Sequence, residues 1–170
     1  ELYRIGNGPS SSHTMAPRFA AERFLAAHPR AASYRVTLYG SLAATGRGHL
    51  TDIVLRRAFA PSTVAIEWKP DEQLPMHPNG MLFETLGQGG KPGNAWRVYS
   101  TGGGAVREDG ETPSASRYPH TTLGEIVRWC EDEGRRFWEY VRQSEGEEIE
   151  GFLGNVWQAM REATERGLET

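Results

Sequence analysis

The local pattern of the sequence changes about two-thirds of the way along the chain, and this change limits the folds that the chain can adopt. The first part alternates between segments with the composition of strands and segments with helical spacing, whereas the last third shows helical spacing alone. Strands are predicted before Gly6 and at 34–39, 63–68, 80–86 and 95–106, with a hairpin turn at 87–93. Helices are predicted at 17–27 and 50–58, with a short helical turn within 40–48. This order predicts an α+β fold, in which a small mixed sheet is flanked by helices and followed by a helical C-terminal tail.

The tail carries two signals for the start of a helix. Thr122 with Glu125, and Ser144 with Glu147, each have the spacing of a capping box. After the second of these, apolar residues recur at helical spacing and predict one apolar stripe. The stripe consists of Ile149, Phe152, Leu153, Val156, Trp157 and Met160.

Composition excludes several classes of protein. The formal net charge of the 170 residues is −3, with both signs mixed along the chain, so no basic footprint for nucleic acid is present. No apolar run approaches the roughly 20 residues that span a bilayer, and no secretory signal is visible. The single cysteine, Cys130, fits a reducing compartment and a cytoplasmic location, and we expect it to be a buried core thiol. One thiolate is too few to ligate an iron–sulfur cluster.

The segment from Gly8 to Thr14 is the first candidate site. It places Ser10, Ser11, Ser12 and His13 directly before a helix start. Free N–H groups at a helix N-terminus attract anions, serine hydroxyls bind carboxylates, and histidine moves protons near neutral pH. The alternative is a helix cap with spare serines, but the block as a whole favours a site.

A second histidine, His49, lies in a glycine-flanked segment at another junction between a loop and a helix, residues 45–52. Glycines at such a junction allow the backbone to approach a ligand closely. On its own, this pattern is more typical of an exposed loop histidine, with Asp52 near the first helical turn, where the helix dipole favours a carboxylate.

Two further segments are weaker candidates. His77 and Asn79 flank a proline just before a predicted strand, although Asn-Gly is also a plain turn signal. Residues 102–104 are three consecutive glycines at the end of a strand pattern. Backbone amides facing a bound carboxylate would explain them, and so would a β-bulge.

Other motifs are missing or incomplete. Lys91 is followed by proline, so the segment is not a phosphate-binding loop, and the N-terminal glycines lack the spacing of a dinucleotide fingerprint. No His-Glu-x-x-His zinc motif is present. His28 and His120 each adjoin a proline and are interpreted as structural or surface residues.

Taken together and in this order, four blocks resemble the β domain of iron–sulfur L-serine dehydratases. The blocks are residues 5–14, 38–52, 77–81 and 99–104. The resemblance covers nearly the whole chain. It predicts a β domain at residues 1–146 and, at 147–170, a helix leading to an absent α domain that holds the cluster. The family β domain is similar in fold to an allosteric substrate-binding domain.

The resemblance implies a lyase of amino-acid degradation and gluconeogenesis that converts L-serine to pyruvate and ammonia without pyridoxal phosphate. In the family, three cysteines of the α domain hold a [4Fe-4S] cluster. This chain is therefore expected to ligate no metal and to be inactive alone. The implied partners are L-serine, the α domain and, for the full-length protein, a second copy in a homodimer.

The resemblance also implies roles for individual residues. His13 and His49 match the histidines thought to transfer protons, so they are the predicted catalytic residues. Ser11, His77 and Asn79 match positions that bind or position serine, and Ser12 is expected to bind substrate beside them. Asn7 and Ala105 depart from the usual residues, but neither departure affects the histidines.

Two other functions are compatible with parts of the sequence. A regulatory module that binds a small anion needs the anion pocket but not two histidines that transfer protons. A hydrolase would use Ser12 and His13 with the triple glycine as an oxyanion hole. We do not expect this, because adjacent residues rarely form a nucleophile–base pair and no nucleophile elbow is present.

Overall fold

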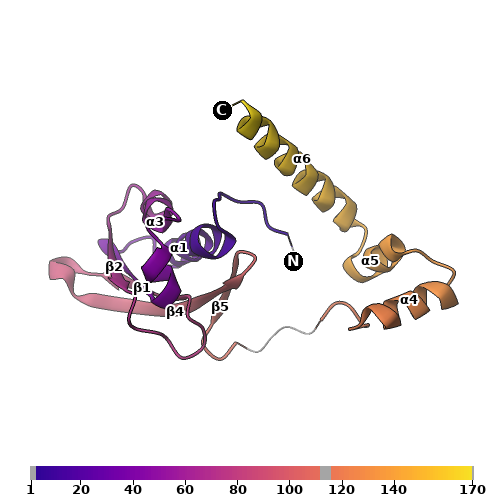
Figure 1. The fold of residues 1–170 in the computed structure, drawn as a ribbon. Helices are drawn as coiled ribbons and strands as arrows, with labels where there is room; N and C mark the ends of the chain where they lie inside the picture. The colour runs from indigo at the N-terminus through magenta and orange to yellow at the C-terminus, as the bar shows by residue number, and fades with distance from the viewer. Residues whose placement is uncertain (1–2, 112–115, 170) are drawn as a thin grey trace. The chain divides into compact units, whose positions relative to one another are not determined.

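The computed structural model describes residues 3–111 and 116–169 (Figure 1). The chain divides into two compact units, Glu1–Glu111 and Thr112–Thr170. The first unit contains the sheet and all four candidate segments, and the second contains only helices. The domain boundary predicted at residue 146 stays a prediction.

A five-stranded mixed sheet forms the framework of the first unit, with the strand order β2-β1-β3-β4-β5. β1 and β2 are parallel, whereas the other neighbouring pairs are antiparallel. The strands are β1 (Ser33–Tyr39), β2 (Val64–Lys69), β3 (Gly80–Leu86), β4 (Pro92–Gly102) and β5 (Ala105–Glu108). The helical elements are η1 (Ser11–Met15), α1 (Ala16–Ala27), α2 (Gly40–Thr45), α3 (Thr51–Phe59) and η2 (Gln88–Gly90). The predicted mixed sheet flanked by helices is confirmed.

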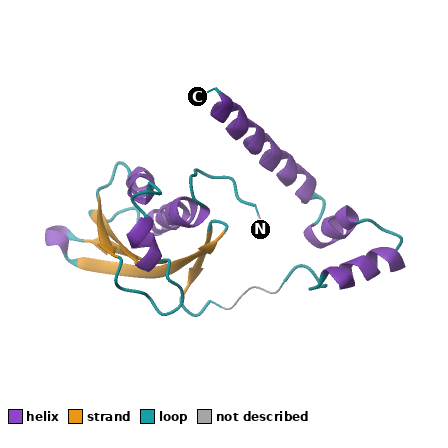
Figure 2. Cartoon of the chain, in the orientation of Figure 1, coloured by secondary structure: helices purple, strands orange, loops and turns teal. Residues whose placement is uncertain are grey.

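The core lies between the sheet and the two longer helices, which cover the same face of the sheet (Figure 2). Burial alternates along β3, as expected for a strand with one face in the core. Phe24 of α1 is 2% exposed and lies in a group of aromatic rings. Its ring is parallel to that of Trp96 at a centroid distance of 6.2 Å and tilted against that of Phe83 at 5.7 Å.

The register of the strands brings distant segments to one edge of the sheet. Leu38, near the end of β1, is opposite Met81, at the start of β3. Gly80 in turn is opposite Tyr99, near the end of β4. The residues that follow β1, precede β3 and end β4 are therefore neighbours, although they lie far apart in the sequence.

Two predictions about strands are wrong. The residues from Tyr3 to Gly6 are irregular, because this segment does not pair with the sheet. The strand predicted at 95–106 is two strands, β4 and β5, joined at Gly103 and Gly104, where φ is 57° and 79°. The register shifts between Ser100 and Gly102, so the glycines provide a tight turn and an irregular strand end, as in the β-bulge alternative.

The second unit consists of α4 (Leu123–Asp132), α5 (Phe137–Glu145) and α6 (Glu148–Leu168). The capping box of Thr122 and Glu125 is confirmed. Backbone N–H groups of Thr122 and Thr121 donate to the Glu125 carboxylate and lower its pKa to about 2. The second predicted box is wrong: Ser144 lies inside α5, because that helix continues to Glu145, and α6 starts after Glu147.

Most of the apolar stripe on α6 is accessible to solvent. Val156 is buried, but Trp157 and Met160 are 62% and 55% exposed. Cys130 of α4 is buried, as predicted. Among the helices of the described residues, none is both long enough and apolar enough to span a membrane.

We expect Phe24→Ala to lower the free energy of unfolding of the first unit by about 3–5 kcal/mol, because it leaves a cavity among packed aromatic rings. Urea denaturation followed by tryptophan fluorescence measures the change. Ile53→Ala on α3 is the control. This side chain is 39% exposed, so its loss costs less than about 1 kcal/mol. Equal effects of the two variants would contradict the placement of Phe24 in the core.

Candidate functional site

The backbone of Ser41 connects two of the candidate segments at the edge of the sheet. Its N–H group donates to the carbonyl oxygen of Pro78 at 3.2 Å. Its own carbonyl oxygen lies 3.3 Å from Nε2 of His13. The first helical residues after β1 therefore contact both the histidine of η1 and the loop that precedes β3.

The local fold of η1 positions His13. The Ser10 hydroxyl caps this turn of π-helix by accepting the His13 N–H at 3.1 Å. The Ser12 hydroxyl lies 2.8 Å from Nδ1 of His13. Since a carbonyl only accepts, Nε2 donates to Ser41 and Nδ1 accepts from Ser12 in the neutral ring. The hydrogen bond between Ser12 and His13 contradicts our expectation that these neighbours would not pair, because the ring is turned back toward the preceding residue.

Two threonines connect His13 to the segment that carries His49. Thr14 donates its hydroxyl to the carbonyl oxygen of His49 at 2.9 Å. Thr51 donates its hydroxyl to the carbonyl oxygen of His13 at 2.6 Å. Both threonines are fully buried, so these hydrogen bonds join the two segments inside the protein.

The two predicted catalytic histidines are in contact. The centroids of the His13 and His49 rings are 4.7 Å apart, with the planes tilted by 37°. His13 is only 8% exposed, and burial lowers its pKa below the ordinary value of 6.5. The hydrogen bond to Ser41 opposes this shift, and the nearby His49 adds to it. His13 is therefore held in its neutral form near pH 7.

A tight turn presents the His49 ring. The carbonyl oxygen of Gly46 accepts from the N–H groups of His49 and Thr51 at 3.1 and 2.9 Å. Leu50 between them has a φ of 59°, which is unusual for a residue with a side chain. Nδ1 of His49 lies 3.0 Å from the carbonyl oxygen of Thr45, so Nδ1 is the donor and Nε2 the acceptor in the neutral ring.

Of the other predicted binding residues, some contact the residues at this edge of the sheet and one is only adjacent to them along the chain. Asn79 donates its backbone N–H to Nδ1 of His77 at 3.1 Å, and both residues adjoin Pro78, which is bonded to Ser41. Ser12 contacts His13 directly. Ser11 has an exposed side chain and is adjacent to the pair only through the chain.

The sequence analysis assigned no specific hydrogen bond to several residues that build this site. The roles of Ser10 and Thr14 were detectable, because hydroxyls at a helix start commonly bond to the backbone. Ser41 lies within the block 38–52, but it acts through its peptide groups, whose contacts no side-chain pattern predicts.

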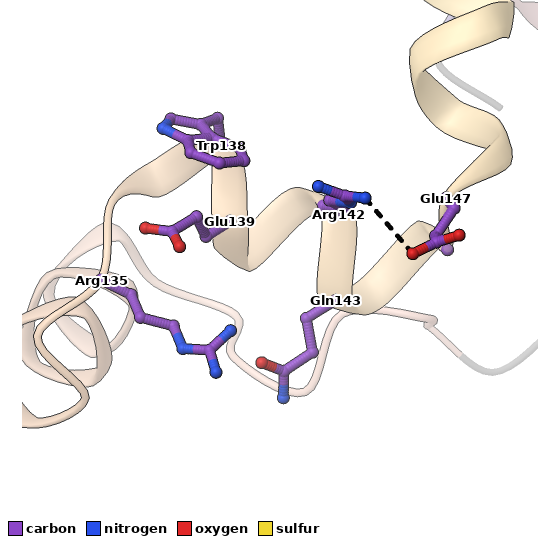
Figure 3. A pocket seen from close by; sticks show the side chains of 7 residues that line it. Arg135, Trp138, Glu139, Arg142, Gln143 and Glu147 are labelled. Atoms are coloured by element: carbon purple, nitrogen blue, oxygen red, sulfur yellow. Dashed lines mark hydrogen bonds and ion pairs between the residues drawn. The ribbon is translucent and has the colours of Figure 1, made fainter.

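The second unit has a groove of about 370 Å³ beside α5 (Figure 3). None of the predicted site residues lines it. Its charged groups are largely engaged: Arg142 pairs with Glu147 at 3.3 Å, and Glu139 accepts the N–H of Arg136 at 2.9 Å. The histidine edge of the first unit is therefore the better candidate site.

The residues present do not fit an iron–sulfur cluster. In residues 3–111 and 116–169, no three His, Cys, Asp or Glu side chains gather closely enough to hold a metal ion. The only cysteine, Cys130, is buried in α4.

Comparison with known proteins identifies the family of this chain. Residues 1–60 and 53–111 match the family model described as the serine dehydratase beta chain. The chain therefore belongs to the serine dehydratase beta chain family.

Individual relatives agree with this assignment. L-serine dehydratase 2 of Escherichia coli K12 is 30% identical, over 100% of this chain and 49% of the relative. L-serine dehydratase of Mycobacterium bovis is 31% identical over 77% of this chain and 38% of the relative. L-serine dehydratase of Haemophilus influenzae is 26% identical over 100% of this chain and 49% of the relative. The chain thus spans about half the length, or less, of the relatives it matches.

We expect Gly46→Ala to lower the free energy of unfolding by about 1–3 kcal/mol, because a Cβ there would collide with the Leu42 carbonyl oxygen and the Trp68 ring. Thermal unfolding measures the effect. Gly48→Ala is the matched control and costs less than about 1 kcal/mol, since its Cβ would lie 3.5 Å from the nearest backbone oxygen. A larger loss for Gly48→Ala would contradict the turn geometry.

We expect the His13 ring to titrate below 6.5 in an NMR titration of the imidazole protons. The unfolded chain then binds more protons than the folded chain between the two pKa values, so stability falls as the pH drops through this window. His49→Gln removes the neighbouring charge and moves the His13 midpoint upward. A midpoint at or above 6.5 in the unmodified chain would refute the effect of burial.

Proposed function

We propose that this chain supplies the β domain of an L-serine dehydratase, a lyase that converts L-serine to pyruvate and ammonia. The contact between the His13 and His49 rings, 4.7 Å apart beside the serine hydroxyls, is the observation that carries the proposal. Membership of the serine dehydratase beta chain family supports it.

The reaction requires groups that this chain does not contain. Hydroxide is a poor leaving group, and a [4Fe-4S] cluster would supply the Lewis acid that stabilises it. Since the residues of this chain do not fit such a cluster, we propose that residues outside the chain hold it. The chain alone is then inactive.

The histidines supply the proton transfer. The α-proton of serine is weakly acidic, so its removal needs a positioned base that is neutral at the working pH. In the neutral tautomer set by Thr45, the lone pair of the His49 ring is on Nε2. We assign the acceptance of the α-proton to this atom. The neutral His13 ring beside it adds no opposing positive charge, because burial keeps its pKa low.

The surrounding hydroxyls and amides bind the substrate. The Ser12 hydroxyl donates to His13 at 2.8 Å and can accept a hydrogen bond from the bound molecule, and the exposed Ser11 hydroxyl offers a donor. His77 and Asn79 approach from the loop before β3. In this proposal the full-length enzyme is a cytoplasmic homodimer, in which the cluster domain faces this edge of the sheet.

We expect His13→Ala and His49→Ala each to lower kcat by about 10²–10⁴-fold in the cluster-loaded full-length enzyme, because His49 accepts the α-proton and His13 is the neutral ring in contact with it. Pyruvate formation under anaerobic conditions measures the rate. His120→Ala in the second unit is the control and keeps the normal kcat. Near-normal turnover of both active-site variants would refute the catalytic assignment.

A further inference from the structure

Two buried polar atoms beside the site lack a hydrogen-bond partner within the described residues: Oγ of Ser100 and Oδ1 of Asn79. Ser100 is completely buried in β4, and the Asn79 side chain is half-buried before β3. A buried polar atom without a partner is destabilising, so native proteins keep few of them, often at functional sites. Two such atoms on residues that are bonded to each other point to a group that they bind.

The two residues are directly paired through their backbones. The Ser100 N–H donates to the Asn79 carbonyl oxygen at 3.0 Å. The side-chain Nδ2 of Asn79 faces the Ser100 carbonyl oxygen at 3.5 Å. This contact fixes the orientation of the amide, because exchanging its oxygen and nitrogen would place two oxygens against each other. The free atom of Asn79 is therefore an acceptor.

The pair belongs to the same edge of the sheet as the histidines. Pro78, next to Asn79, accepts from Ser41, which in turn accepts from His13. Ser100 lies two residues after the core residue Val98 and thus on the same face of the sheet, and β4 is in contact with η1.

We propose that Ser100, together with Asn79, forms the subsite for the α-ammonium group of the amino-acid substrate. This inference rests on the proposed function and adds a binding residue to it. Oδ1 of Asn79 only accepts hydrogen bonds, and the Ser100 hydroxyl accepts as well, so the pair is complementary to an ammonium group with its three donors. A carboxylate is excluded from this position because it offers no donor to Oδ1.

The test measures binding to this chain directly, with isothermal titration calorimetry and two probes. The probes are L-serine and 3-hydroxypropionate, which lacks the ammonium group. We expect Ser100→Ala to weaken L-serine binding about tenfold, since it removes one hydrogen bond to a charged group, and to leave 3-hydroxypropionate binding unchanged. Thermal unfolding without ligand is the second measurement. Ser100→Ala should keep or raise Tm, because the hydroxyl it removes has no partner.

Thr85→Ala is the matched control. Thr85 is also a buried hydroxyl residue, on β3, but its Oγ1 accepts from the Asn94 N–H at 2.8 Å. This variant should therefore lower Tm and leave the binding of both probes unchanged.

The outcomes separate the inference from the proposed function. Equal L-serine affinity of Ser100→Ala and the unmodified chain would overturn the ammonium subsite alone. So would a lower Tm of Ser100→Ala without ligand, which would show that the hydroxyl has a structural partner such as a buried water. Equal weakening of both probes would place Ser100 against another part of the substrate. If the unmodified chain bound no L-serine, the proposed role of this edge in substrate binding would itself be overturned.

Discussion

The peptide groups of Ser41 hold the candidate site together. Its carbonyl oxygen contacts the His13 ring, and its N–H group binds Pro78, so one residue connects η1 with the loop before β3. Ser41 occupies this position because β1 ends beside the start of β3. The site therefore depends on the register of the sheet, which in turn depends on the alternation of core and surface residues in the central strands.

Burial and contact then determine the chemistry of the two histidines. The buried hydroxyls of Thr14 and Thr51 bind the backbone carbonyls of His49 and His13. These bonds hold the two segments together, and the two rings are in contact. The lowered pKa of His13 follows from its burial and from the nearness of a second imidazole. A buried imidazole with a lowered pKa stays neutral near pH 7, so this arrangement favours the neutral form of His13.

The same edge contains two buried polar atoms that have no hydrogen-bond partner among the described residues. Ser100 and Asn79 bind each other through their backbones but leave a hydroxyl and an amide oxygen unpaired. Elsewhere in the first unit, buried hydroxyls such as those of Thr14, Thr51 and Thr85 have partners. The contrast distinguishes polar groups that stabilise the fold from polar groups that are kept for a ligand.

The sequence by itself determined most of the local elements, and it selected His13 and His49 as the candidate histidines. Periodicity predicted β1, β2, β3, α1 and α3, and the spacing of Thr122 and Glu125 predicted a capping box, because these signals arise from neighbours along the chain. Only the tertiary structure decided that His13 and His49 are in contact, that the strand at 95–106 turns at its glycines, and that the peptide groups of Ser41 contact both His13 and Pro78. The reason is physical: these contacts depend on sheet register and on backbone groups, which every residue carries and no side-chain pattern reveals.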